Sequence, residues 1–299
     1  METLDLGRQH EGDDEFKARM RLHQSVFRAK RLNAGWKAYG NRLGRSAALA
    51  GKNFHSGYPD IFRNVCSRYP LKYVPLYYDM LRSQHIPWNM FAPLQLETDF
   101  AVPFVVSLLN TANAHVIGIR KILIEHAPKP RERFLADNTS HDVYLELIDR
   151  DKRIHGFGIE IKFTEHSYPY GAGERRAMQD PHSRYNTVNN QAKLYKKDSL
   201  PRLGTQRLKQ MWRNQLLGET MLRDSDLGLD TFTLVVLQPE GNEYCIESCR
   251  RYADCIKDDQ KSKFVQITFE RFVQEGRRFE NSLKIRHWLD YVEERYIGQ

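Results

Sequence analysis

The sequence lacks the features of a secreted or membrane protein. Its 299 residues include only four cysteines, and their spacing matches neither a C-x2-C zinc pair nor a disulfide framework. Its longest apolar runs, such as residues 100–109, are about half as long as a bilayer-spanning helix, and no apolar signal region opens the chain. We therefore expect a cytoplasmic protein with reduced thiols and no membrane partner.

The chain also has no internal repeat, low-complexity tract or Gly/Ser-rich linker. With 40% hydrophobic and 28% charged residues, it can bury a full core in one or two domains. We expect a basic, mainly helical N-terminal extension over residues 1–78. A second domain would occupy residues 79–299 and carry a basic insertion at about 165–206.

Acidic residues are scarce in two long segments. Residues 16–52 carry ten Lys or Arg and no Asp or Glu, and residues 175–213 carry ten against two acids. Together with the net charge of +8, these segments indicate a polyanionic partner such as nucleic acid, although solvated segments with no partner would look the same. The candidate phosphate-binding residues of the second segment are Arg175, Arg176, Lys193, Lys196, Lys197 and Arg213.

The periodicity of the second domain predicts an α/β fold. The order of elements is helix, three strands, helix and strand (αβββαβ), which favours a mixed sheet with flanking helices. The expected elements are a helix over 97–112, a strand over 115–124, a hairpin over 142–148 and 157–163, a helix over 207–223 and a strand over 231–238. A short strand near 264–269 and a helix over 282–296 follow, and a basic helix over 14–32 lies in the extension.

An E-x-K motif, Glu160 and Lys162, lies in the second strand of the hairpin. The motif alone has little specificity, because Glu15 and Lys17 repeat it in a predicted helix, where residues two apart do not face each other. In a strand, the two side chains point to the same face. The hairpin would bring Asp142, at the start of the preceding strand, beside them.

This arrangement predicts metal-dependent hydrolysis of phosphodiesters. Asp142 and Glu160 would form a hard-oxygen site suited to Mg2+, which takes one or two carboxylates and keeps several waters. Such a site activates water, and the Lys162 ammonium would stabilise the attacking hydroxide or the transition state.

Three further acidic or amide side chains are candidates for accessory roles. Gln215 and Glu219 fall in the middle of the apolar stripe of the helix over 207–223, where they need polar partners. These partners are either the active site or neighbouring backbone groups. Glu97 shares a helix face with apolar residues, where it is either an accessory acid or simply favourable to the helix dipole.

These residues resemble the PD-(D/E)XK nuclease superfamily, and more narrowly a bacterial group of restriction-endonuclease-like proteins. A histidine, His141, replaces the proline of the superfamily name. The likeness rests on five ordered segments: DMLRSQHIPWNMFAPL (79–94), NTSHDVYLEL (138–147), GIEIKFTEH (158–166), RNQLLGE (213–219) and LDYVEERYI (289–297).

The resemblance implies a restriction-endonuclease-like fold, with residues 79–299 as the nuclease domain. It implies that Asp142, Glu160 and the backbone carbonyl of Ile161 bind Mg2+ or Mn2+. Lys162 would assist the attacking water, and Gln215 would be the helix-borne accessory residue. Glu165 belongs to the family-like segment and is a further accessory candidate.

The leading hypothesis is a Mg2+-dependent endonuclease that cuts duplex DNA in restriction or phage defence, as a homodimer if both strands are cut. One alternative is a nuclease for RNA or for branched or damaged DNA. Another is a nucleic-acid-binding module of the same fold that does not cut. A third is a toxin-like or nucleotide-activated effector whose first ninety residues are the sensor or dock, although these residues contain no Gly-rich phosphate loop.

Overall fold

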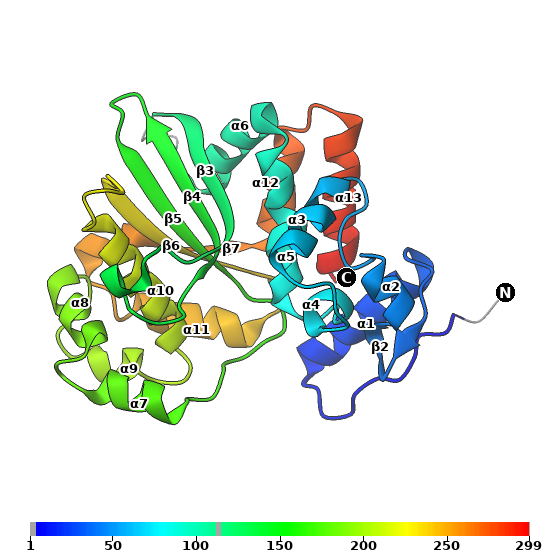
Figure 1. Ribbon diagram of the computed structural model, residues 1–299, viewed down its shortest axis with the longest axis horizontal. Coiled ribbons are helices and arrows are strands. Elements are labelled where there is room, and N and C mark those ends of the chain that lie inside the picture. The colour runs from blue at the N-terminus through cyan, green and yellow to red at the C-terminus, as the bar shows by residue number, and fades with distance from the viewer. Residues whose placement is uncertain (1–3, 112–114, 299) are drawn as a thin grey trace.

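A five-stranded mixed sheet lies at the centre of the computed structural model, which describes residues 4–111 and 115–298 (Figure 1). The strands follow in the spatial order β3 (Val116–His126), β4 (His141–Asp149), β5 (Ile154–Ile161), β6 (Thr231–Gln238) and β7 (Phe264–Thr268). The first three pair antiparallel and the last two join in parallel. The predicted α/β class with a mixed sheet is therefore confirmed.

The predicted hairpin is formed by β4 and β5, which turn back at residues 150–153. Val143 pairs with Ile159, and both side chains are buried on the same face of the sheet. Tyr144 points to the opposite face and belongs to a second buried cluster. Successive side chains of a pleated strand point to opposite faces of the sheet. One face of this hairpin is therefore apolar, whereas the other also carries polar groups.

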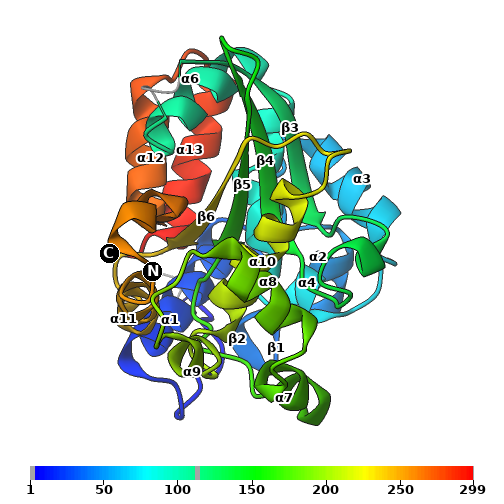
Figure 2. The same ribbon diagram turned by 90° about the vertical axis from the view of Figure 1, so that its left-hand side faces the viewer.

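Helices cover both faces of the sheet (Figures 1 and 2). One face packs against α6 (Thr98–Leu108), α12 (Phe269–Arg278) and α13 (Leu283–Tyr296). The other packs against α8 (Arg184–Ala192), α10 (Lys209–Leu222) and α11 (Glu243–Ala253). The periodicity predicted α6, α10 and α13 but not α11 and α12, and residue 112, the predicted end of α6, lies outside the described residues.

A glycine lets α10 approach the sheet closely. A Cβ atom at Gly218 would lie 1.9 Å from a ring carbon of Phe232 in β6, well inside van der Waals contact. The helix backbone therefore rests directly on this aromatic ring. This close approach fixes the distance between α10 and the sheet. It therefore also determines which strand residues the polar side chains of α10 can contact.

The N-terminal region is more structured than predicted. The expected helix is α1 (Glu15–Lys30), and Asp14 caps it by accepting from the Lys17 amide. The other elements of this region are β1 (Trp36–Lys37), β2 (Tyr39–Leu43), α2 (Arg45–Leu49), α3 (Pro59–Arg68) and α4 (Pro75–Tyr78). The two-stranded sheet of β1 and β2 was not predicted.

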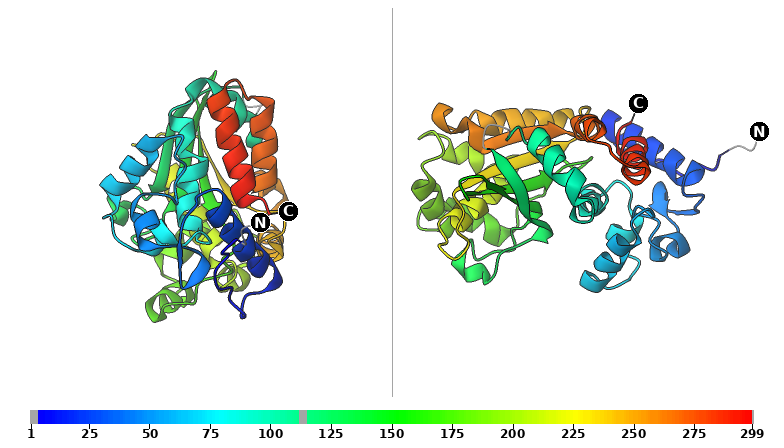
Figure 3. Two further views of the ribbon diagram at one scale, coloured as in Figure 1. Left: turned by 90° about the vertical axis from the view of Figure 1, so that its right-hand side faces the viewer. Right: turned by 90° about the horizontal axis from the view of Figure 1, so that it is seen from above.

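The N-terminal helix packs beside the last helix of the chain (Figure 3). Met20 and Phe27 of α1 belong to the same buried cluster as Leu289 and Val292 of α13. Some cations of the basic segment are structural, since Arg28 is buried and donates to the carbonyl of Gly40. The basic composition of residues 16–52 therefore does not mean that every one of their cations lies on the surface.

Short helices form the remaining connections. They are the 3-10 helices η1 (Ser83–His85), η2 (Ala92–Gln95), η4 (Arg131–Arg133) and η5 (Asp258–Lys263), and the α-helices α5 (Ile86–Met90), α7 (Ala172–Gln179) and α9 (Leu200–Leu203). The predicted basic insertion thus contains α7, α8 and α9. Within the described ranges, no helix has the length and apolarity needed to cross a membrane.

Candidate active site

Three carboxylates form a row across adjacent strands. Continued by one residue from the pairs at Val143, the antiparallel register brings Glu125 of β3 beside Asp142 of β4, and Asp142 beside Glu160 of β5. Side chains directly opposite each other on antiparallel strands are close neighbours. All three line a cleft of about 540 Å3, which also contains Lys162.

Glu160 and Lys162 are almost fully buried, with 2% and 8% of their surfaces exposed. The Lys162 Nζ lies 2.9 Å from the Glu160 Oε1. Helix α10 completes this pair: Gln210 donates to the Glu160 Oε1 and accepts from the Lys162 Nζ at 2.5 Å, and Asn214 donates to the Glu160 Oε2 at 2.6 Å. The orientation of both catalytic candidates is thus fixed by two amides.

The Asp142 carboxyl has far fewer polar partners. Its Oδ2 accepts from the backbone amide of Ile161 at 2.7 Å. Burial raises its pKa well above the usual value, and the nearby charges of Glu160 and Glu125 raise it further. A carboxylate in this position gains stability from any cation that enters the cleft.

The surroundings of Lys162 favour its protonated form. Burial alone would lower its pKa, but the charge and hydrogen bond of Glu160 outweigh burial and raise the pKa above the usual value. The side chain is therefore suited to serve as a positive charge and a hydrogen-bond donor rather than as a base.

Glu165 lies in the same cleft and connects it to a distant segment. Its Oε1 accepts from the Ser83 amide at 2.6 Å, and its Oε2 accepts from the amides of Phe163 and Thr164 at 3.2 Å each. Glu165 therefore orders the loop that follows the E-x-K strand and fastens it to η1.

The opposite wall of the cleft comes from residues 69–84, which run from the end of α3 through α4 into η1. Tyr69, Lys72 and Arg82 line this wall, and Tyr168 joins them from the loop after β5. The sequence had assigned no function to this segment. This segment lines the cleft because the chain folds back over the sheet. No local sequence pattern indicates this long-range arrangement.

Gln215 and Glu219 are not brought to this cleft. Gln215 is fully buried and donates to the Glu219 Oε1 at 3.1 Å, while Glu219 pairs with Arg223 at 3.4 Å and with Lys263 at 3.6 Å. The helix residues that meet Glu160 are instead Gln210 and Asn214. Their i, i+4 spacing is a signal that could have identified them from the sequence.

Glu97 also lies away from the cleft. It stands at the N-cap of α6, and its Oε1 forms an ion pair with Lys284 at 2.7 Å. These contacts agree with the simpler expectation of an acid at a helix start.

The predicted phosphate-binding cations do not line the cleft either. Arg213 is held by ion pairs of 2.8 Å with both Asp137 and Glu174. The exposed members of the predicted set are Arg175, Arg176, Lys193, Lys196 and Lys197.

Glu125 is the residue of the row that the sequence did not reveal. Its backbone has a φ of 54°, an unusual left-handed conformation for a residue with a side chain. The Arg68 guanidinium of α3 donates to the carbonyls of Ile124 and Glu125 and supports this irregular strand end. Burial raises the pKa of Glu125 to about 7, and the charge of Glu160 contributes.

The raised pKa makes stability depend on pH. A carboxyl whose pKa is higher in the folded state than its ordinary 4.5 favours folding at low pH, and this contribution is lost as the pH rises toward about 7. Without metal, we expect Glu125→Gln to be more stable than the parent by roughly 1–3 kcal/mol at pH 8, and the gap to shrink toward pH 4.5. Urea unfolding in EDTA at several pH values measures the gap. A gap that is the same at pH 5 and pH 8 would contradict this expectation.

The donor set fits a hard divalent cation. Among residues 4–111 and 115–298, no group of three or more His, Cys, Asp or Glu side chains is arranged to hold a metal ion as it stands. Mg2+ needs only one or two carboxylates, since water and substrate oxygens complete its octahedron. Asp142 and Glu160 supply these two groups, and the repulsion within the row indicates a place for positive charge.

Comparison with known proteins agrees with this geometry. A family model described as "PD-(D/E)XK nuclease superfamily" matches residues 11–298, which is nearly the whole chain. No curated protein and no solved structure matches the chain significantly. The family match includes α1 and the segment that walls the cleft, as well as the sheet with its row of carboxylates. The chain therefore belongs to the PD-(D/E)XK nuclease superfamily.

Proposed function

We propose that this cleft hydrolyses phosphodiester bonds of DNA with Mg2+ or Mn2+ as cofactor. The observation that carries the proposal is the convergence of Asp142, Glu160 and Lys162 in one cleft of a member of a nuclease superfamily. Asp142, Glu160 and the Ile161 carbonyl would hold the cation, with Glu125 beside them. When bound, the cation supplies Lewis-acid activation of water and neutralises charge on the phosphate.

The protein groups supply positioning and charge stabilisation. Lys162 remains an ammonium and donates to the oxygen on which negative charge develops. Gln210 and Asn214 keep Glu160 from rotating away, since each donates to one of its oxygens. The oxygen of water forms the new bond to phosphorus and the P–O3′ bond breaks, which leaves a 5′-phosphate and a 3′-hydroxyl that takes up a proton.

The opposite wall would bind the strand being cut. Lys72 and Arg82 can neutralise phosphates on either side of the scissile bond, and Tyr69 and Tyr168 offer rings against which a base or sugar can pack. The exposed cations of the insertion would bind flanking DNA nonspecifically. With one such site per chain, cutting both strands of a duplex requires two copies, so the full assembly would be a homodimer. We place this homodimer in the cytoplasm and assign it to restriction or phage defence.

Nicking of supercoiled plasmid tests the activity. The parent should nick with Mg2+ or Mn2+ and stop in EDTA, and Asp142→Asn should be at least about a hundred-fold slower. If parent and variant bind DNA with equal, salt-sensitive affinity and neither cuts it or RNA with any divalent cation, the protein is a non-cleaving binding module. Cleavage of RNA alone would make it a ribonuclease.

Two glutamines of α10 allow a matched comparison. We expect Gln210→Ala to lower cleavage by about 10- to 100-fold, because a second-layer contact that orients both Glu160 and Lys162 is lost. Gln215→Ala should instead lower stability by about 1–3 kcal/mol and leave cleavage per folded molecule unchanged. Cleavage rates and urea unfolding of both variants measure the two effects. If Gln215→Ala lost cleavage while Gln210→Ala kept it, the helix would present Gln215 to the substrate.

A further inference from the structure

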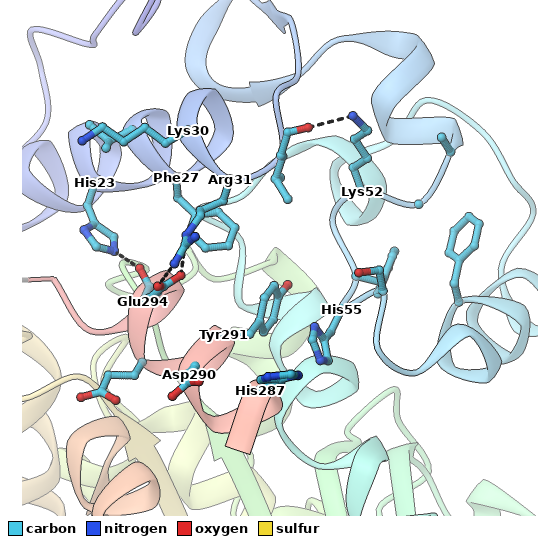
Figure 4. A pocket seen from close by; sticks show the side chains of 18 of the residues that line it. His23, Phe27, Lys30, Arg31, Lys52, His55, His287, Asp290, Tyr291 and Glu294 are labelled. Carbon is cyan, nitrogen blue, oxygen red and sulfur yellow. Dashed lines mark hydrogen bonds and ion pairs between the residues drawn. The ribbon is translucent and has the colours of Figure 1, made fainter. Parts of the chain in front are cut away.

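A second and larger pocket lies between the N-terminal region and the last helix (Figure 4). It measures about 1190 Å3, and none of its lining residues also lines the nuclease cleft. Its walls come from α1, from residues 50–62 and from α13. These segments are far apart in the sequence, so a molecule bound here would contact the N-terminal region and α13 at once.

Aromatic rings form the floor of this pocket. The rings of His55 and Tyr291 lie 4.4 Å apart with an angle of 31° between their planes, and the Phe27 ring meets Tyr291 edge-on at 5.8 Å. Burial lowers the pKa of His55 to about 4, and the charges of Arg295 and His287 lower it further. At neutral pH His55 is therefore an uncharged ring, suited to stacking against a flat aromatic group.

Within the described part of the chain, two lysines and a histidine at the pocket have no carboxylate partner. Among the described residues, Lys30 and His287 have no hydrogen-bond or ion-pair partner, and Lys52 donates only to backbone carbonyls, at 2.8 Å to that of Leu32. Figure 4 shows Lys30 on α1 and Lys52 on the facing segment. An anion placed beside these lysines would not have to displace a carboxylate from either of them.

The carboxylates of the pocket are all engaged. Glu294 pairs with Arg31, and Asp290 and Glu293 pair with Arg277 at 2.5 and 2.9 Å. They line the α13 side, which also carries His287, so the two lysines of the pocket are confined to α1 and the facing loop. This confinement favours a short phosphate chain over the continuous backbone of a nucleic-acid strand, which would have to pass the acids of α13.

A fully buried arginine adds to the positive field behind the floor. Arg295 has no carboxylate partner among the described residues; its guanidinium is bonded to Asn53, Tyr291 and the His85 ring. It also lies 5.5 Å from the centre of the Tyr291 ring. An unpaired charge in the interior is costly, and an anion in the adjacent pocket would offset part of that cost.

We propose that this pocket binds a free nucleoside phosphate. The base would stack on the His55 and Tyr291 rings, and the phosphates would lie among Lys30, Lys52 and His287. The pocket volume exceeds the lower limit of about 300 Å3 for small-molecule sites, so a nucleotide fits without any opening of the fold.

Calorimetric titration of the full-length protein with ATP and with GTP, in EDTA so that no nucleic acid is cut, tests the proposal. We expect saturable one-to-one binding of at least one of them. Lys30→Glu and His287→Glu should each weaken it about ten-fold or more, because each replaces a phosphate partner by a like charge. Arg19→Glu is the matched control, because Arg19 is an exposed cation of the same helix that does not line the pocket. Lys162→Ala should bind as the parent does.

Three results would overturn the proposal. They are the absence of saturable binding of both nucleotides to the parent, equal affinity of the parent and Lys30→Glu, and binding of a 12-nucleotide single strand at this pocket without binding of either nucleotide. Since Lys30 is exposed on a helix surface, its variant should keep the parent's unfolding transition, and this separates lost binding from lost folding.

Discussion

Replacement of Lys162 by alanine should lower the rate of DNA cleavage by about a hundred- to a thousand-fold or more. Lys162 is 8% exposed, and its Nζ lies 2.9 Å from the Glu160 Oε1, so a cation from solvent cannot replace this buried ammonium without a cost in desolvation. Removing it also leaves the Glu160 carboxylate without its ion-pair partner in a buried place. Single-turnover cleavage at saturating Mg2+ measures the effect on the chemical step.

Lys162→Arg is the informative partner variant. It keeps the charge, but its planar guanidinium cannot reproduce the point-like contacts to Glu160 and Gln210. DNA affinity measured in EDTA should stay close to that of the parent in both variants, because Lys162 lies inside the cleft and its loss affects the transition state more than binding. If Lys162→Ala cuts as fast as the parent, Lys162 has no catalytic role.

The second large effect concerns the helix that carries Gln210 and Asn214. We expect Gly218→Ala to lower stability by about 3 kcal/mol and the melting temperature by roughly 6 °C, because the new methyl group would overlap the Phe232 ring. The relief of this overlap must move α10 away from the sheet. Cleavage should then fall as well, since both amides lose contact with Glu160.

Gly173→Ala makes the same chemical change in a helix with open space around it. No heavy atom lies within 4 Å of a Cβ at that position, so alanine should be neutral or slightly stabilising through its helix propensity. Thermal unfolding and cleavage of both variants give the comparison. A Gly218→Ala protein with the parent's melting temperature would show that α10 does not rest on Phe232 as described.

The local patterns of the sequence predicted the central part of the sheet. Alternation along β4 and β5 and the turn between them are short-range features, and they suffice to place Asp142 across from Glu160. The same reasoning separated Glu160 and Lys162 from the second E-x-K copy in α1. A strand aims both side chains at one face, whereas a helix does not.

The apolar stripe of α10 pointed to Gln215, whereas the structure brings Gln210 and Asn214 to Glu160, because the direction in which a helix faces is not encoded locally. Each residue turns the direction of the side chain by about 100°. An apolar stripe gives only the mean direction of burial. The residue that meets Glu160 depends on how close the helix comes to the sheet, and that is set by Gly218 against Phe232.

Glu125 and the wall of residues 69–84 could not be predicted for a different reason. The left-handed backbone of Glu125 is supported by Arg68, which lies 57 residues earlier in the chain. The wall is fastened by the contact of Glu165 with Ser83, across 82 residues. Contacts over such separations leave no periodic signal in the sequence.

Diffraction from crystals soaked in Mn2+ tests the central claim most directly. We predict an anomalous peak between the carboxylates of Asp142 and Glu160 in the parent, and its loss in Asp142→Asn crystals of the same form. A parent crystal without this peak, at a Mn2+ concentration that saturates nuclease activity in solution, would contradict the assignment of this cleft as the catalytic centre.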